Sequence, residues 1–200
     1  MSAPVLPAQF YNRPTLEVAR DLLGCLLCRR LEDGAILRGR IVEVEAYTAD
    51  DPASHSFRGR TARNYPMFGP PGRSYVYFIY GMYNCFNVVT EPEGTPGAVL
   101  VRGLDRLSSS NGRNEAANLL ANGPGKLCRV FSIARELNDI DLTDPKGPLW
   151  LEKGPLSEAD RVIACARIGI NMAKDRQWRF YLLPSVGVSK RDRKAEQQIL

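Results

Sequence analysis

The segment "SYVYFIYGMYNCF", residues 74–86, constrains the fold of this chain more than any other. Two runs rich in aromatic and β-branched residues, 74–80 and 83–90, lie on either side of Gly81-Met82. Such runs are typical of strands, and a two-residue break containing glycine is typical of a hairpin. Four of the chain's eight tyrosines fall here. Because a buried phenol needs a hydrogen-bond partner, an ordinary apolar core does not explain this crowding.

Further patterns place the hairpin in a mixed fold. The expected strands are 25–31, 35–47, 98–104 and 179–183, with a turn at 32–34. The expected helices are 14–23 with Thr15 as N-cap, 114–120, 123–133 and 156–168. Strands dominate the middle and helices the second half, without regular βαβ alternation. We therefore expect one α+β domain over residues 1–200, built around a mainly antiparallel sheet, with about 1–8 and 196–200 loosely ordered.

Composition favours a polyanionic partner. The net charge is +5 and the sequence pI is about 9.0. Basic residues cluster in "FRGRTARN", which holds Arg58, Arg60 and Arg63, and in "SKRDRKAEQ" near the end of the chain. Both segments suit contact with phosphates, although a solvated loop and a frayed tail are the alternatives. No apolar run approaches the roughly 20 residues of a membrane span, so we expect no membrane partner.

The N-terminal segment and the cysteines indicate an intracellular protein. "MSAPVLPAQFYNRP" lacks the basic start and apolar run of a signal peptide, which favours the cytoplasm or nucleoid of a bacterium, or the nucleus of a eukaryote. Five cysteines without a regular framework fit reduced thiols. Cys25 and Cys28 form the one CxxC, but no second ligand pair accompanies them and the chain has one histidine. We expect no metal and no cofactor.

Missing motifs narrow the possible chemistry. The chain lacks the Walker phosphate loop, GxGxxG, GxSxG and HExxH. The HxE and PCxxC signature of zinc nucleobase deaminases is also missing. These absences argue against enzymes that carry those motifs, namely P-loop nucleotide hydrolases, dinucleotide-binding enzymes, serine hydrolases of the GxSxG type and zinc-dependent hydrolases or deaminases.

Glu45 is the candidate catalytic acid. It lies near the end of the strand "RIVEVEAY", where acidic residues are depleted in general, and Tyr47 and a long polar loop, 48–73, follow it. A carboxylate at such a position can activate a water as general base. The alternative is a solvated edge-strand glutamate. His55, the sole histidine, lies in the same loop.

The hairpin tip is the second candidate functional feature. Tyr80 and Tyr83 flank Gly81-Met82 and are expected to point beyond the tip. Exposed aromatic and methionine side chains on a projecting hairpin suit insertion between base pairs. Tyr77 is expected to face another surface and to line a pocket. Ordinary sheet packing is the alternative for the whole hairpin.

Several long blocks together resemble one family. "RGRIVEVEAY", "RTARNYPMF", "SYVYFIYGMYNCFNVV", "AVLVRGL", "NGPGKLC" and "WRFYLLPSVGVS" occur in the same order as in the alkyladenine DNA glycosylases, the mammalian-type 3-methyladenine DNA glycosylases. The resemblance runs from about residue 9 to 195. It implies a curved sheet with a hairpin that inserts into DNA, and a monofunctional enzyme of base excision repair. Such an enzyme flips alkylated or deaminated purines (3-methyladenine, hypoxanthine, ethenoadenine) and hydrolyses their N-glycosidic bond without a cofactor.

The resemblance also implies roles for particular residues. Glu45 matches the water-activating glutamate, and Arg102 matches an arginine near that water and the target phosphate. Tyr47 and His55 match residues that stack on one side of the flipped base, with Tyr77 on the other side. Asn87 matches an asparagine that disfavours the 2-amino group of guanine.

The remaining implied roles concern DNA. Tyr80 matches the wedge that fills the vacated stack, with Met82 and Tyr83 beside it. Arg60, Arg63 and Lys126 are expected to contact the backbone of double-stranded DNA that contains a damaged purine, bound by a monomer. Two other readings stay open: a non-catalytic protein that binds damaged DNA, and an acyl- or formyl-transferase-related module. Substrate preference also stays open.

Overall fold

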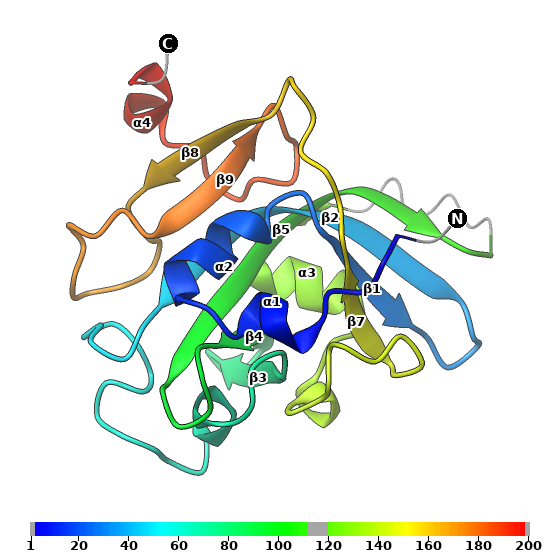
Figure 1. The fold of residues 1–200 in the computed structure, drawn as a ribbon. Helices are drawn as coiled ribbons and strands as arrows, with labels where there is room; N and C mark the ends of the chain where they lie inside the picture. The colour runs from blue at the N-terminus through cyan, green and yellow to red at the C-terminus, as the bar shows by residue number, and fades with distance from the viewer. Residues whose placement is uncertain (1–2, 112–119, 199–200) are drawn as a thin grey trace.

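A computed structural model describes residues 3–111 and 120–198 (Figure 1). The helices are α1 Ala8–Tyr11, α2 Thr15–Asp21, α3 Pro124–Val130 and α4 Arg193–Gln197, and the 3-10 turns are η1 Tyr65–Phe68 and η3 Arg135–Leu137. The strands are β1 Leu26–Arg30, β2 Ile36–Tyr47, β3 Ser74–Ile79, β4 Tyr83–Thr90, β5 Gly97–Ser109, β6 Ala121–Asn122, β7 Leu149–Glu152, β8 Arg161–Cys165 and β9 Arg179–Leu183.

Within the described ranges, the strands form one nine-stranded sheet in which neighbours run antiparallel. The main order is β3-β4-β5-β2-β1-β7, with β6 beside β5 and β9 pairing with both β2 and β8. This confirms the expected α+β domain around a curved, mainly antiparallel sheet. The hairpin of β3 and β4 forms one edge of the main path.

β2 is the strand around which the sheet curls. Along one edge, its residues 36–40 pair with β1 and residues 43–45 pair with β9. Along the other edge it pairs with β5, with register shifts near residues 38–40 and 41–44. Such irregularities bend a strand and increase its twist. The sheet consequently divides into a β1–β7 branch and a β9–β8 branch, which diverge from β2 in Figure 1.

Side-chain alternation divides β3, β4 and β5 between two environments. One set of alternate residues packs into the main apolar core together with α2: Val76, Phe86, Val88, Val99 and Val101. The set between them lines a cavity described below: Tyr75, Tyr77, Ile79, Cys85, Asn87, Ala98, Leu100 and Arg102. Because successive side chains of a strand point to opposite faces, the same strands build both the core and the site.

The predicted helix over 156–168 is wrong, since this segment contains β8. Ile163 and Cys165 of β8 are buried, and the strand pairs with β9 in register from Arg161 to Cys165. The short run "RVIAC" carries no periodicity that separates a helix from a strand, and the partner strand decides. β7 was not predicted, and the helix expected over 123–133 spans only Pro124–Val130.

Two other expectations concern helix ends. Thr15 is not an N-cap: it is the first residue of α2, and its hydroxyl contacts Thr90 Oγ1 at 2.9 Å and Glu91 Oε1 at 2.7 Å. The side chain thus ties α2 to the end of β4 instead of its own helix. The expected helix over 114–120 lies almost entirely outside the described residues.

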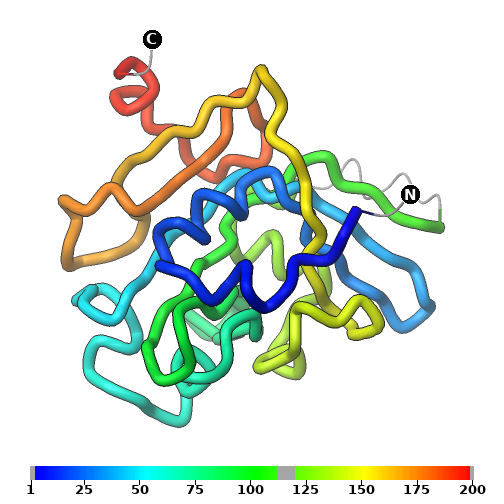
Figure 2. The backbone as a smooth tube through the Cα atoms, viewed as in Figure 1, coloured from blue at the N-terminus to red at the C-terminus, as the bar shows by residue number. Residues whose placement is uncertain are grey.

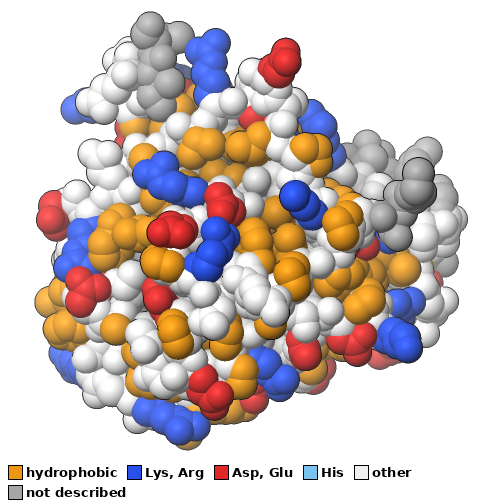
Figure 3. Space-filling model, in the orientation of Figure 1, with side chains coloured by type: hydrophobic (Ala, Val, Ile, Leu, Met, Phe, Trp, Pro, Cys, Tyr) orange, Lys and Arg blue, Asp and Glu red, His pale blue; other side chains and the backbone are white. Residues whose placement is uncertain are grey.

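A long connection joins β7 to β8 and passes over the sheet (Figure 2). The buried Arg40 in β2 pairs with Asp160 at its end, and Asp160 also accepts hydrogen bonds from Ser157. On the face where α1 and α2 lie, acidic and basic side chains are interspersed, so net charge does not mark that face for DNA (Figure 3). Among the described helices, none has the length and apolar character to cross a membrane.

Candidate active site

A cavity of about 540 Å³ opens beside the sheet. Tyr47 of β2 and alternate residues of β3, β4 and β5 form its strand wall. The segments 122–126 at the start of α3 and 168–170 after β8 complete the lining together with Ala53, His55, Met67 and Tyr80. Polar groups and aromatic rings therefore converge on one apolar cavity, the arrangement expected of a small-molecule or base-binding site.

Glu45 lies directly behind this wall and is fully buried. Its Oε2 accepts hydrogen bonds from the Tyr47 hydroxyl at 2.9 Å and Arg102 Nη1 at 3.2 Å, while Oε1 accepts the Ile168 amide at 2.7 Å. All three donor residues line the cavity. A solvated edge-strand glutamate is therefore not what the structure contains.

These donors leave the Glu45 carboxylate room for one more partner. An ionised carboxylate offers about four acceptor positions, and three are occupied. The residue itself does not line the cavity, so a water that reaches the fourth position must lie close to Tyr47, Arg102 and Ile168. The Glu45 carboxylate therefore has room to bind a single water.

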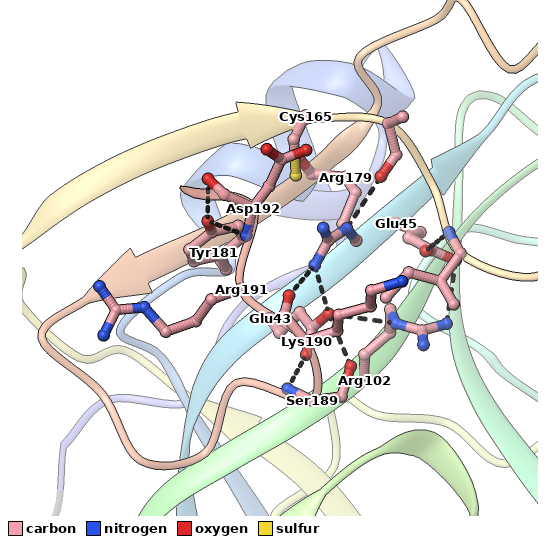
Figure 4. A network of polar contacts seen from close by, with 12 residues as sticks. Glu43, Glu45, Arg102, Cys165, Arg179, Tyr181, Ser189, Lys190, Arg191 and Asp192 are labelled. Atoms are coloured by element: carbon pink, nitrogen blue, oxygen red, sulfur yellow. Dashed lines mark hydrogen bonds and ion pairs between the residues drawn. The ribbon is translucent and has the colours of Figure 1, made fainter. Parts of the chain in front are cut away.

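Glu43, two residues before Glu45 in β2, is the centre of a second set of polar contacts (Figure 4). Its carboxylate is fully buried and accepts from Arg102 Nε at 3.3 Å, Arg179 Nη1 at 3.0 Å, the Ser189 amide at 2.6 Å and the Ser189 hydroxyl at 2.9 Å. Arg179 Nη1 also donates to the Lys190 carbonyl at 2.7 Å. Glu43 thereby joins β2, β5, β9 and the segment after β9.

Protonation states follow from this burial and pairing. Burial opposes the charge of Arg102, but the carboxylates of Glu45 and Glu43 outweigh it and raise the pKa of its guanidinium. Burial and then the Glu45 carboxylate raise the pKa of Tyr47 well above its ordinary value. The Tyr47 hydroxyl is therefore protonated at neutral pH and acts as a donor to Glu45.

Three rings form the aromatic end of the cavity. His55 and Tyr77 meet edge to face with 4.6 Å between their centroids, and Tyr75 donates to or accepts from His55 Nδ1 at 2.9 Å. Partial burial and then the charge of Arg63 lower the pKa of His55, which favours its neutral form. Because His55 and Tyr77 touch, a flat base that entered between them would have to separate the two rings.

The loop that carries His55 is held by Asn64, a residue that sequence reasoning missed. Asn64 is 2% exposed, and its amide donates to the His55 carbonyl at 2.7 Å and to the Gly59 carbonyl at 3.0 Å. Asn87 is also buried, and its Nδ2 donates to the Tyr75 carbonyl at 2.9 Å at the edge of the cavity. Buried amides with fixed partners define the shape of this end of the cavity.

The hairpin tip carries two strongly exposed apolar side chains. Tyr80 is 79% exposed and Met82 is 65% exposed. Ile79 pairs with Tyr83, so three residues, Tyr80, Gly81 and Met82, connect β3 to β4 instead of the expected two. Tyr80 and Gly81 both have positive φ, 54° and 69°, which is typical of a tight hairpin turn. Tyr83 is placed differently, since its ring packs against Gly125 at the start of α3, where a Cβ would lie 2.8 Å from a ring atom.

The candidate phosphate contacts lie around the cavity. Arg60, Arg63 and Lys126 are exposed. Arg63 packs on the Tyr77 ring, 5.3 Å from its centroid, and donates to the Phe78 carbonyl at 3.1 Å. Lys126 lines the cavity and donates to Asn122 Oδ1 at 2.9 Å.

The described part of the chain offers no group of three or more His, Cys, Asp or Glu residues that could hold a metal ion. All five cysteines are buried free thiols, including both members of the CxxC. The structure thus brings Arg102, Tyr47, His55, Tyr77 and Asn87 to one cavity, with Glu45 bound to two of them. The exposed Tyr80 lies at the rim of the same cavity, whereas the exposed Met82 is not part of its lining. Their roles in catalysis and DNA binding stay predictions.

Comparison with known proteins identifies one family. A family model described as methylpurine-DNA glycosylase matches residues 9–185. Proteins named "Putative 3-methyladenine DNA glycosylase" are 50% identical in Methanocella arvoryzae, covering 94% of this chain and 97% of the relative, and 46% identical in Synechococcus elongatus, covering 94% and 92%. A protein of the same name from Carboxydothermus hydrogenoformans is 48% identical, covering 94% and 100%. The chain belongs to the methylpurine-DNA glycosylase family, hydrolases that cleave the N-glycosyl bond of methylated purines in DNA.

Proposed function

We propose that this enzyme flips a damaged purine nucleotide out of double-stranded DNA and hydrolyses its N-glycosidic bond with a water activated by Glu45. The observation that carries the proposal is the buried Glu45 carboxylate. Its three donors, Tyr47, Arg102 and Ile168, orient it and also line the cavity. Water attacks the sugar C1′, the bond to the base breaks, and the base takes the bonding electrons. Glu45 accepts the proton of the water, and an abasic site remains.

Arg102 supports this step from the next strand. Its guanidinium binds both Glu45 and Glu43, so its position is fixed before DNA arrives. A fixed cation beside the reacting sugar suits a contact with the phosphate of the flipped nucleotide. The paired carboxylates keep that cation charged.

The aromatic side chains that line the cavity would hold the base. Stacking on Tyr47, His55 and Tyr77 is worth roughly 1–3 kcal/mol per base contact, which offsets part of the cost of flipping. An alkylated, positively charged purine stacks well and leaves readily. Asn87, fixed by Tyr75, would exclude the 2-amino group of guanine. Hypoxanthine and ethenoadenine are flat bases without that 2-amino group, so we include them among the substrates.

Release of bases from a defined set of duplexes tests this proposal. Oligonucleotides carry hypoxanthine or ethenoadenine, and a separate duplex carries radiolabelled methyl groups on its purines. We expect single-turnover release from the damaged duplexes and none from undamaged adenine or guanine. Tight binding to these lesions without release would instead support a non-catalytic lesion binder.

The hairpin tip supplies the wedge in this proposal, and Tyr80→Asn tests it. Asparagine tolerates the positive φ of this position, so the turn is kept while the ring is lost. We expect weaker binding to a duplex containing an abasic analogue, by about 1–3 kcal/mol, and unchanged thermal unfolding. Tyr65→Asn, which removes another partly exposed tyrosine, is the control. Equal binding by Tyr80→Asn and the unaltered enzyme would show that Tyr80 does not act as a wedge.

A further inference from the structure

A buried ion pair that includes none of the expected site residues lies close to Glu45 and Tyr47. The side chains of Arg167, directly after β8, and Asp51, in the loop after β2, are both fully buried. Arg167 donates to both carboxylate oxygens of Asp51, through Nη1 and Nη2, the latter at 2.9 Å. A bidentate guanidinium–carboxylate pair fixes distance and orientation together.

The pair connects the elements that hold the Glu45 carboxylate. Arg167 Nη1 also donates to the Ala46 carbonyl at 2.9 Å, between Glu45 and Tyr47 in the chain. The Arg167 guanidinium carbon lies 4.6 Å from the centroid of the Tyr47 ring. The next residue, Ile168, gives its amide to Glu45 Oε1 at 2.7 Å. One arginine therefore contacts or adjoins two of the three donors to Glu45.

Asp51 extends the same connection toward His55. Its carboxylate accepts the Ala53 amide at 3.1 Å, and its carbonyl accepts the Ser54 amide at 2.8 Å. These bonds fix the first turn of the loop that leads to His55. Ala53 itself lines the cavity.

We propose that Arg167, held by Asp51, is a positioning residue for base release: it sets the Tyr47 ring and the Ile168 amide, and through them the Glu45 carboxylate. This inference rests on the proposed function. Arg167 does not touch the base or the reacting sugar. Its effect is on the geometry of groups that do.

Lysine cannot replace arginine in this role. Its ammonium keeps the charge that Asp51 needs, but it lacks the planar fork and stacks less well on an aromatic ring. Arg167→Lys should thus leave the buried charge paired while releasing the Ala46 carbonyl and the Tyr47 ring. Small displacements of catalytic groups lower rates on the order of 100-fold.

The test compares Arg167→Lys with a matched substitution outside the site. Arg40→Lys alters another buried arginine–aspartate pair, with Asp160, which does not line the cavity. Both variants are assayed below their unfolding temperatures, by single-turnover release of ethenoadenine at saturating enzyme and by binding to a duplex with an abasic analogue. We expect a loss of about 10- to 100-fold in the release rate for Arg167→Lys alone. Binding to the abasic analogue should be unchanged, since that ligand has no base to place against Tyr47.

Several outcomes would overturn the inference. A folded Arg167→Lys enzyme with the unaltered rate would do so, as would equal losses of rate in both variants. If Arg167→Lys does not fold, the double variant Asp51→Asn with Arg167→Gln removes both charges together and takes its place. Absence of release by the unaltered enzyme would overturn the proposed function instead, before any variant is compared.

Discussion

Replacing Glu45 by glutamine is expected to lower the single-turnover rate of base release by about 10²- to 10⁴-fold, the usual contribution of a general base. Glutamine keeps the shape of the side chain and one carbonyl oxygen, so hydrogen bonds from Tyr47 and Arg102 can persist. It cannot accept the proton of an attacking water. The loss should therefore fall on the rate, while binding to a duplex with an abasic analogue is retained.

Glu152→Gln is the matched control for this substitution. Glu152 is also a buried glutamate at the end of a strand, 4% exposed, and accepts from Arg38 and Trp150. It does not line the cavity. We expect base release at the unaltered rate from Glu152→Gln. If Glu45→Gln also released base at that rate, another group would have to activate the water.

Replacing Glu43 by alanine is expected to lower the free energy of unfolding by about 3–5 kcal/mol, the range found when one partner of a buried ion pair is removed. Arg179 is 3% exposed and loses its carboxylate partner, and the guanidinium of Arg102 keeps only Glu45. The amide and hydroxyl of Ser189 lose their acceptor as well. Unfolding by urea, followed by circular dichroism, measures the change.

Asp50→Ala provides the comparison for Glu43→Ala. Asp50 pairs with Arg176 at the surface, where its own side chain is 73% exposed, and such pairs contribute about 0–1 kcal/mol. We expect its removal to have little effect on unfolding by urea. A Glu43→Ala variant as stable as Asp50→Ala would show that the buried cluster does not stabilise the fold.

The sequence predicted the strands that build the cavity because alternation along a strand is local. Tyr75 and Tyr77 share one face of β3, and Leu100 and Arg102 share one face of β5, whatever lies beyond them. The glycine at the hairpin tip could also be predicted locally, because Gly81 has a positive φ, which glycine adopts without strain. These features can be predicted without knowing which strands pair.

The difference between Glu43 and Glu45 was harder to predict. Both acids lie on the same face of β2 because they are two residues apart, and neither spacing nor residue type separates them. Apart from Arg102, which binds both, their distant partners do: Glu43 is bound by Arg179 and Ser189, whereas Glu45 is bound by Ile168 of the cavity wall. Those partners are 136, 146 and 123 residues away in the chain. The role of Arg167 was not predicted for the same reason, since nothing near it in the sequence indicates contact with Asp51 or Tyr47.

Product analysis on methylated duplex DNA tests the central claim most directly. The unaltered enzyme is mixed with DNA that carries radiolabelled methylpurines, and the released bases and the strands are analysed separately, with and without alkali. We predict free methylated purine and strands that break only after alkali, because hydrolysis leaves an abasic site in an intact backbone. Strands that break without alkali would contradict hydrolysis by water and would direct attention to Lys126, whose amine lies at the cavity. Absence of free base would contradict the account as a whole.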